Sequence, residues 1–312
     1  MIGRTWAIAI NTFREAVRDK VLYGVLAFAT LVLLFTLALA ELSLGEERRV
    51  VMDIGLASIS IFSVIVAVFL GSSLLYKEIE RKTLHVILPR PVRRWEFLVG
   101  KYLGIALTGF VFICIMGATQ LWVASIQADA PLPYVVAMPV VLAVLLVATI
   151  LRSRDRTTVL LPLSVLALGS GVALASMTDV DLTVAVASLV LTAGEVLVVA
   201  AVAVLFSSFS TPFLTGAFTL GVWLAGRSAD SMVNMRTEVF GAQVKGTLRV
   251  LAEIVPNLNL FVPGRHTLQT MATELGGVGP WTYVAQTMGY GILYSGVVLV
   301  VASIIFSRRD FL

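Results

Sequence analysis

Long uninterrupted runs of apolar residues constrain this chain more than any other feature of its sequence. A transmembrane helix needs about 20 such residues to cross a hydrocarbon core of ~30 Å. Five runs reach this length, and they occupy residues 21–40, 54–76, 102–126, 182–206 and 282–306. Only 13% of the residues are charged, about half the share that is usual in soluble domains. The sequence therefore predicts an all-α polytopic membrane protein.

Three weaker apolar runs complete the predicted set of membrane crossings. Residues 134–151 and 159–177 are separated by a short link that starts with RSRDR, so they predict an extra hairpin over residues 134–177. The run 212–226 has only 15 residues; as a helix it covers ~22 Å, and it is expected to span with its flanks or to be broken. Six core helices and the extra hairpin together give eight crossings.

The distribution of Lys and Arg predicts the orientation of the chain in the membrane. Basic residues accumulate in the cytoplasmic loops of membrane proteins. With the N-terminus inside and eight crossings, 16 of the 23 basic residues fall on the cytoplasmic side. Both termini are then cytoplasmic, and removal of the extra hairpin leaves this result unchanged. We expect a multi-pass protein of the cell inner membrane, embedded in the lipid bilayer.

The first 20 residues are charged and amphipathic, and they lack the short apolar core of a cleavable signal peptide. A helix over residues 1–20 would carry Trp6, Ile10, Phe13 and Val17 on one side and charged residues on the other. Such a helix suits the inner membrane surface, where its bases lie near anionic head groups. The alternative is a plain cytoplasmic extension of the first spanning helix.

Residues that usually perform catalysis or hold metals are scarce. Cys114 is the single cysteine, and His85 and His266 are the only histidines, which excludes intrachain disulfides and argues against a conventional zinc site. No G-x-x-x-x-G-K-[ST] phosphate loop occurs in the sequence, so any nucleotide chemistry must come from another chain. We expect no catalytic residue, no metal and no cofactor. The inner loops account for the net charge of +4, so no nucleic acid is required as a partner.

The segment 77–101 lies between two spanning runs yet holds ten charged residues. The first part of this segment is predicted to form a helix, with Glu80 on its apolar side. Pro89 would end that helix, because proline disfavours helical geometry in the residue before it. The polar face of this helix follows from spacings of three and four residues. It consists of Glu78, Arg81, Lys82 and His85.

This charged segment predicts a docking surface for a second, soluble protein. A simple inner turn between two helices needs only two to eight residues, whereas this segment has about 25 and an amphipathic helix of its own. The alternative is a solvated basic loop that merely follows the cytoplasmic bias of Lys and Arg.

Several short runs in the chain resemble one family of membrane proteins. Glu78-Ile-Glu-Arg-Lys-Thr-Leu, Leu88-Pro-Arg-Pro-Val-Arg-Arg and Gly100-Lys-Tyr-Leu-Gly resemble the signature of ABC-2 type permeases. The chain also resembles the narrower branch that serves multicopper-enzyme maturation, as in nitrous oxide reductase assembly. Similar runs over nearly the whole length include Trp6-Ala-Ile-Ala-Ile-Asn-Thr-Phe-Arg-Glu-Ala, Glu41-Leu-Ser-Leu-Gly-Glu, Phe206-Ser-Ser-Phe-Ser-Thr-Pro, Pro256-Asn-Leu-Asn-Leu-Phe and Phe306-Ser-Arg-Arg-Asp-Phe.

The resemblance implies a single transmembrane permease domain over residues 1–312, without catalytic activity of its own. Such a permease forms a homodimer or a heterodimer of permeases, with a second copy of the chain as the expected partner. The dimer joins two separate ATP-hydrolysing subunits of an ATP-binding cassette transporter. In that family the segment after the second crossing is a coupling helix, which sits in a cleft of the ATPase. Carried over to this chain, the ATPase-contacting residues are Glu78, Glu80, Arg81, Lys82, Thr83 and His85. Lys82 departs from the glycine of many members, and the extra hairpin departs from the usual six crossings.

The sequence is compatible with two functions. The first is an ATP-powered permease of unspecified substrate. The second is a non-transporting membrane subunit that relays ATPase-driven motion to a periplasmic partner, for example in metalloenzyme maturation. An ion-coupled secondary transporter is disfavoured because no clear inverted repeat appears.

Glu195 is the only charged residue well inside a predicted span. A carboxylate at that depth costs about 2.5–3.5 kcal/mol on insertion scales, so a partner, a water-lined path or protonation is expected. Glu195 either belongs to a conformational or substrate pathway, or it anchors neighbouring helices by hydrogen bonds. The resemblance favours the anchor, because similar permeases often carry a glutamate at this place.

The stretch 227–281 is expected on the outer side of the membrane. Met232 and Met235 form an M-x-x-M pair there, with His266 and Met271 further along the chain. Thioether ligands suit copper(I), but two methionines in an amphipathic run are more typical of packing residues. No metal site is therefore predicted in this stretch.

Overall fold

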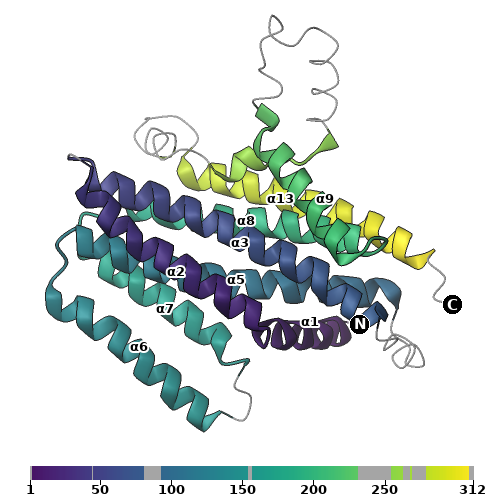
Figure 1. Cartoon of the computed structure of the whole chain (residues 1–312), viewed down its shortest axis with the longest axis horizontal. Coiled ribbons are helices and arrows are strands. Elements are labelled where there is room, and N and C mark those ends of the chain that lie inside the picture. Colours follow the sequence, from purple (N-terminus) through teal and green to yellow (C-terminus); the bar gives the residue numbers. More distant parts are fainter. Residues whose placement is uncertain are drawn as a thin grey trace, which may run out of the picture.

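A computed structural model of the chain describes residues 2–43, 45–80, 93–153, 157–230, 254–262, 268 and 279–308. Every regular element in these ranges is a helix. The five long apolar runs are confirmed as α2 (Lys20–Glu41), α3 (Glu47–Glu80), α5 (Arg94–Gln127), α8 (Leu182–Ser207) and α13 (Pro280–Ser307). In Figure 1 these helices run side by side along the length of the molecule.

The predicted hairpin forms α6 (Leu132–Arg152) and α7 (Leu160–Ala175), and the short run forms α9 (Pro212–Arg227). With α6 included, six helices in the described part are long and apolar enough to cross a membrane. α7 and α9 have 16 residues each, or ~24 Å. The fold is therefore the expected all-α membrane domain, and the crossing of α7 and α9 stays a prediction.

α7 extends between the two ends of the bundle despite its length. Its first residues, Leu160 and Leu161, pack beside Phe13 of the N-terminal helix. Its last residue, Ala175, packs with Ala40 and Val51 at the turn between α2 and α3. The hairpin thus begins and ends at opposite ends of the neighbouring helices.

Local signals explain where several helices begin. The Asp19 carboxylate accepts a hydrogen bond from Val21 N at 3.1 Å, and the Asp181 carboxylate accepts one from Val184 N at 3.2 Å. Both caps satisfy amides that the first turn of a helix leaves without partners. α9 starts at Pro212, a position where the missing N–H of proline has no cost.

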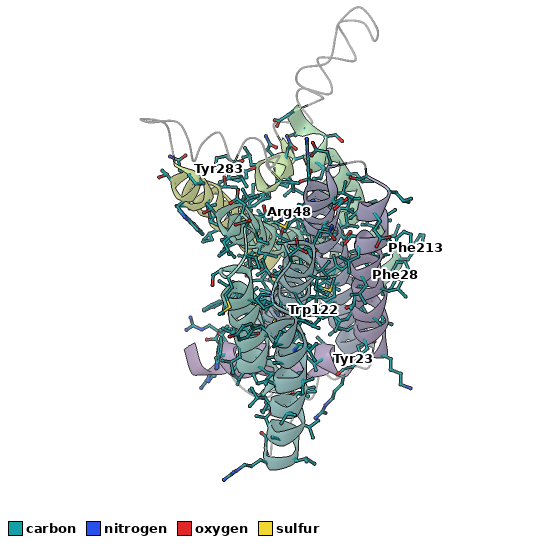
Figure 2. The ribbon with its side chains drawn as sticks, turned by 90° about the vertical axis from the view of Figure 1, so that its left-hand side faces the viewer. Tyr23, Phe28, Arg48, Trp122, Phe213 and Tyr283 are labelled. Carbon is teal, nitrogen blue, oxygen red and sulfur yellow. The ribbon has the colours of Figure 1, made fainter. Side chains whose placement is uncertain are left out.

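α1 (Ile2–Val17) is the predicted N-terminal helix. Figure 2 looks along the bundle and shows α1 extending sideways across the direction of the long helices. α1 packs against the first part of α5, where Gly100 and Gly104 leave room for it. A Cβ at Gly104 would lie 2.4 Å from Thr12 Cβ, and one at Gly100 would lie 2.7 Å from Ile8 Cβ. The glycines therefore allow the two helices to touch closely.

The buried side of α1 differs in part from the apolar side that the sequence indicates. Phe13 and Val17 are buried against Val111 of α5, but Trp6 is 52% exposed. The side chains that meet Gly100 and Gly104 are Ile8 and Thr12 instead. Thr12 is fully buried, and so is Ala9, whose carbonyl oxygen also lies against Gly104. A location of α1 at the membrane surface remains a prediction.

Candidate functional site

Glu195 lies at the middle of α8 and is completely buried. It follows Leu182 by 13 residues and precedes Ser207 by 12, so ~20 Å of helix separate it from either end. Four donors surround its carboxylate. Oε1 accepts from Trp223 Nε1 and Arg227 Nε, both at 2.8 Å, and Oε2 accepts from Ser60 Oγ at 2.6 Å and Arg227 Nη2 at 3.1 Å.

Three helices supply this polar cluster, which consists of Ser60, Glu195, Trp223 and Arg227. Ser60 comes from α3, Glu195 from α8, and the other two from α9. Trp223 and Arg227 are one helical turn apart and face the same direction. The Arg227 guanidinium also donates to Ser60 Oγ and lies 5.4 Å from the centre of the Trp223 ring.

The polar cluster gives a buried charge a complete set of partners. An ion pair of this kind gains little net stability, because desolvation of both groups offsets their attraction. Loss of one partner is costly, since it leaves the other charge uncompensated in a medium of low dielectric constant. The cluster therefore holds α9 against α3 and α8 in one arrangement.

Arg227 is the residue that sequence reasoning missed. It was assigned to the start of the outer stretch 227–281, whereas the structure makes it the last residue of α9. One signal could have found it: a base at the end of a short apolar run needs a partner as much as the lone acid Glu195 does. Arg227 also suits its place near the C-terminus of a helix, where the macrodipole is negative.

The chain after α9 is held at Asp230, three residues beyond the end of that helix. Asp230 accepts hydrogen bonds from Asn257 Nδ2 at 2.9 Å and from Asn259 Nδ2 at 2.6 Å. These two asparagines flank the start of a 3-10 turn, η1 (Leu258–Phe261). The end of α9 and η1 are thus joined through side chains that are 27 and 29 residues apart in sequence.

Phe261 wedges η1 between α8 and α13. A Cβ at Gly194 would lie 2.6 Å from the Phe261 ring, and one at Gly291 would lie 2.9 Å from it. Both positions require glycine for this close approach. Phe261 is 1% exposed. Its neighbour Gly194 directly precedes Glu195 in the chain.

Tyrosines of α13 hold the backbone of the same segment. Tyr283 donates its hydroxyl to Leu260 O at 2.6 Å, and the Tyr290 hydroxyl accepts from Asn257 N at 3.0 Å. Irregular backbone inside a membrane domain is tolerated where protein groups satisfy it. The η1 segment meets this condition.

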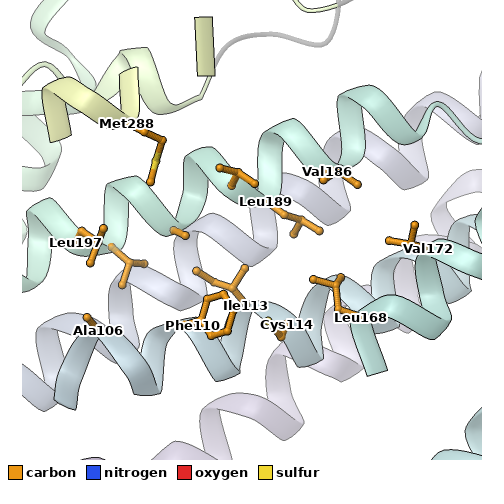
Figure 3. Close-up of a pocket in the computed structure, with 13 residues that line it drawn as sticks. Ala106, Phe110, Ile113, Cys114, Leu168, Val172, Val186, Leu189, Leu197 and Met288 are labelled. Carbon is orange, nitrogen blue, oxygen red and sulfur yellow. The ribbon is translucent and has the colours of Figure 1, made fainter. Parts of the chain in front are cut away.

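An apolar pocket of about 370 Å³ lies on the other side of α8 (Figure 3). Phe110 and Cys114 of α5, Leu168 of α7 and Met288 of α13 are among the side chains that line it. The α8 residues in its wall include Val186, Val190, Ala193 and Leu197, a helical stripe that faces away from Glu195. α8 therefore separates a polar cluster from a pocket suited to an apolar group.

The charged segment 77–101 is described only at its two ends. The backbone of α3 continues through Glu78 to Glu80, while Arg81, Lys82, Thr83 and His85 lie outside the described residues. The polar face expected for this segment therefore stays a prediction.

The end of the segment is fixed to two other helices. Arg94 Nη1 donates to the carbonyls of Phe306 and Ser307 at 3.3 and 2.9 Å, at the C-terminus of α13. Lys101 is buried and lies 3.7 Å from the Glu15 carboxylate of α1. The start of α5 thus touches both the first and the last described helices.

Met232, Met235, His266 and Met271 lie outside the described residues, and so does most of the stretch 227–281. Within the described ranges, no three His, Cys, Asp or Glu side chains come together in a way that could hold a metal ion.

In a comparison with protein families, residues 6–311 match the model described as ABC-2 family transporter protein. A search of curated proteins finds no match.

Proposed function

Because the chain belongs to the ABC-2 family of transporter proteins, we propose that it is the permease subunit of an ATP-binding cassette transporter. A separate ATPase subunit supplies the energy, and a second copy of this chain completes the transmembrane unit. The substrate is left open. We further propose that the protein lies in the cell inner membrane with both termini in the cytoplasm, as the distribution of its basic residues predicts.

The observation that carries this proposal is the continuity of α3. This helix has 34 residues, or ~50 Å, and includes both Ser60 of the polar cluster and Glu80 at the start of the charged segment. The two residues are 20 positions apart, so ~30 Å of helix connects them. A displacement of the charged segment by the ATPase would therefore reach Glu195 through one rigid element.

The attachment of the start of α5 to two other helices also supports the proposal. The last part of the charged segment is the start of α5, a second helix of 34 residues. These first two turns contact α13 through Arg94 and α1 through Lys101. Force applied between Lys77 and Lys101 would act on four helices together. A loop that only follows the charge bias would need no such attachment.

ATPase contact is proposed for Glu78, Arg81, Lys82, Thr83 and His85. The family resemblance also assigns Glu80 to the ATPase contact. Glu80 lies on the apolar side of the predicted helix, however, so we propose that it faces the permease and joins the helix before Pro89 to the start of α5. The helical spacing and the family resemblance both support four of these ATPase contacts, and the family resemblance alone supports Thr83. The segment would then have one face toward the ATPase and one toward the permease. Mutations on each face can test the two roles independently.

Co-purification and transport test the proposal. The chain purified alone should hydrolyse no ATP, and a co-expressed ATPase subunit should bind it and drive substrate movement in vesicles. ATP hydrolysis by the isolated chain would exclude the division of labour between two chains.

The relay function is the second candidate, and the contact between α9 and η1 favours it. Through Asp230, the end of α9 holds Asn257 and Asn259, so a shift of the polar cluster would also move the outer segment. A periplasmic partner bound there would sense ATP hydrolysis without any transport. ATPase-dependent binding of such a partner, with no flux in vesicles, would favour the relay.

Membership of the multicopper-enzyme maturation branch is likewise a proposal. It rests on the sequence runs at both ends of the chain and at Pro256-Asn-Leu-Asn-Leu-Phe. Loss of copper-enzyme maturation on deletion of the gene, restored by the intact chain, is the result expected.

A further inference from the structure

A groove of about 390 Å³ lies between α6 and α7. Met138, Leu142 and Leu145 line it on the α6 side, and Leu166, Ser170 and Ala173 line it on the α7 side. The Ser170 hydroxyl donates to Ala167 O at 2.7 Å within its own helix. Apart from Tyr134, which is half exposed, the groove therefore presents an apolar surface to its occupant.

α6 is attached to the bundle mainly near its start. Trp122 Nε1 of α5 donates to Val135 O at 2.9 Å, and Val135 is the only buried residue among the α6 side chains that the structure describes. Further along, Val144 is 61% and Val147 is 54% exposed. In Figure 1 α6 lies at the margin of the bundle, beside α7. The groove between the two helices is thus accessible from the side.

Arg152 lies in line with the groove. Met138, Leu145 and Arg152 are spaced by seven residues, so they share one face of α6. Arg152 is exposed and forms no ion pair with any residue that the structure describes. Leu142 and Arg152 are ten positions apart, so ~15 Å of helix separates them, which is half of a ~30 Å hydrocarbon core. The basic side chain therefore stands one leaflet's depth from Leu142, in the part of the groove nearer to Arg152.

We propose that the groove between α6 and α7 binds an anionic phospholipid, with its acyl chains along Met138–Leu145 and its phosphate at Arg152. An apolar groove with a cation two helical turns beyond Leu145, on the same face of α6, matches the two chemical parts of such a lipid. Basic side chains at a membrane surface favour anionic over neutral head groups.

A second protein copy fits this groove less well than a lipid. Close helix contacts inside membranes use small residues that let two backbones approach. The groove face of α6 instead carries large, flexible or branched side chains such as Met138, Leu142 and Leu145. Flexible acyl chains can adapt to such a surface, whereas the large side chains would keep the backbone of a second helix away from α6.

Photo-crosslinking tests the proposal with the full chain in lipid nanodiscs. The probe is phosphatidylglycerol with a photoreactive group midway along one acyl chain, and adducts are mapped by mass spectrometry of peptides. We expect adducts in α6 and α7, competed by unlabelled phosphatidylglycerol but not by phosphatidylcholine at the same excess. Arg152→Gln should lower capture about fivefold, as expected for one basic residue at an anionic surface, and Arg152→Lys should retain it.

Matched variants separate the groove from the general lipid boundary. Ala173→Phe should fill the groove and abolish the competed adducts. Val140→Phe, at an exposed α6 position outside the groove, and Arg308→Gln, at an exposed base after α13, should leave capture unchanged. Equal competition by phosphatidylcholine would overturn the proposal, as would full capture by Arg152→Gln. A disulfide between two copies through Leu142→Cys would assign the groove to a second copy instead.

Discussion

Arg227 binds both carboxylate oxygens of Glu195, with Nε 2.8 Å from Oε1 and Nη2 3.1 Å from Oε2, although 32 positions separate them in the chain. This contact attaches α9 to α8 at the middle of the membrane domain. Ser60 adds α3 to the same contact. The helix that leads to the proposed ATPase contact is therefore coupled to α9, and the residues after α9 are joined to η1 through Asp230.

Removal of either charge from this pair should destabilise the protein. We expect Arg227→Gln to lower the free energy of unfolding by about 3–5 kcal/mol, because it leaves the fully buried Glu195 carboxylate without compensation. Glu195→Gln should cost less, because the Arg227 side chain that it leaves is 24% exposed. The double variant should lose less than the sum of the two single losses. Denaturant unfolding in a fixed detergent measures the cycle. Additive losses would mean that the two residues do not act as a pair, and Arg48→Gln at an exposed outer pair serves as the control.

Charge reversal in the segment 77–101 should separate ATPase binding from folding. Glu78→Lys combined with Arg81→Glu should weaken ATPase association by about 2–5 kcal/mol, through like-charge contacts and partner groups left unpaired. The variant should still insert into the membrane, because the spanning helices are unchanged. Pull-down of the ATPase, with membrane expression checked, measures the effect.

Two comparisons make this test specific. Glu80→Ala should lower membrane expression rather than ATPase binding alone, because Glu80 is proposed to join the two inner helices. Arg48→Glu with Asp179→Arg reverses an exposed pair elsewhere and should bind the ATPase normally. If the Glu78 and Arg81 double variant binds and stimulates the ATPase fully, the segment is only a basic loop.

Cysteine labelling should establish the topology of the hairpin formed by α6 and α7. With Cys114 replaced, a cysteine at Ser153 should react from the cytoplasmic side and one at Thr178 from the outer side. The expectation follows from the base count and from the contacts of α7 at both ends of the bundle. Labelling of both positions from one side would reduce the eight crossings to six.

Gly104→Ala should displace α1 from α5. The added Cβ would lie 2.4 Å from Thr12 Cβ and 2.8 Å from Ala9 O, and overpacking of this kind costs about 1–3 kcal/mol. Gly289→Ala is the matched control, because nothing lies within 4 Å of its Cβ and alanine favours the helix. Thermal unfolding should therefore show a lower Tm for the first variant and an equal or higher Tm for the second.

The sequence predicts the spanning helices well because length and apolar character decide them. It also identifies Glu195, because a single acidic residue within a spanning helix is energetically costly and therefore needs an explanation. It does not predict the partner, because Arg227 stands at the end of a run of only 15 apolar residues and was counted with the outer bases. The isolated position of α6 was not predictable either. A side chain such as Val144 suits contact with lipid and contact with protein equally well, so composition alone cannot distinguish the two.

The ring of Phe261 limits how α8 and α13 can move relative to each other. It occupies two notches, at Gly194 and Gly291, while the positions one turn away on α8 are Val190 and Val198, whose branched side chains offer no such space. Gradual sliding of one helix along the other would therefore drive the ring into a side chain. The two helices can keep their present register, or they can change it in one step once the ring has left. The contact therefore favours discrete registers over gradual sliding.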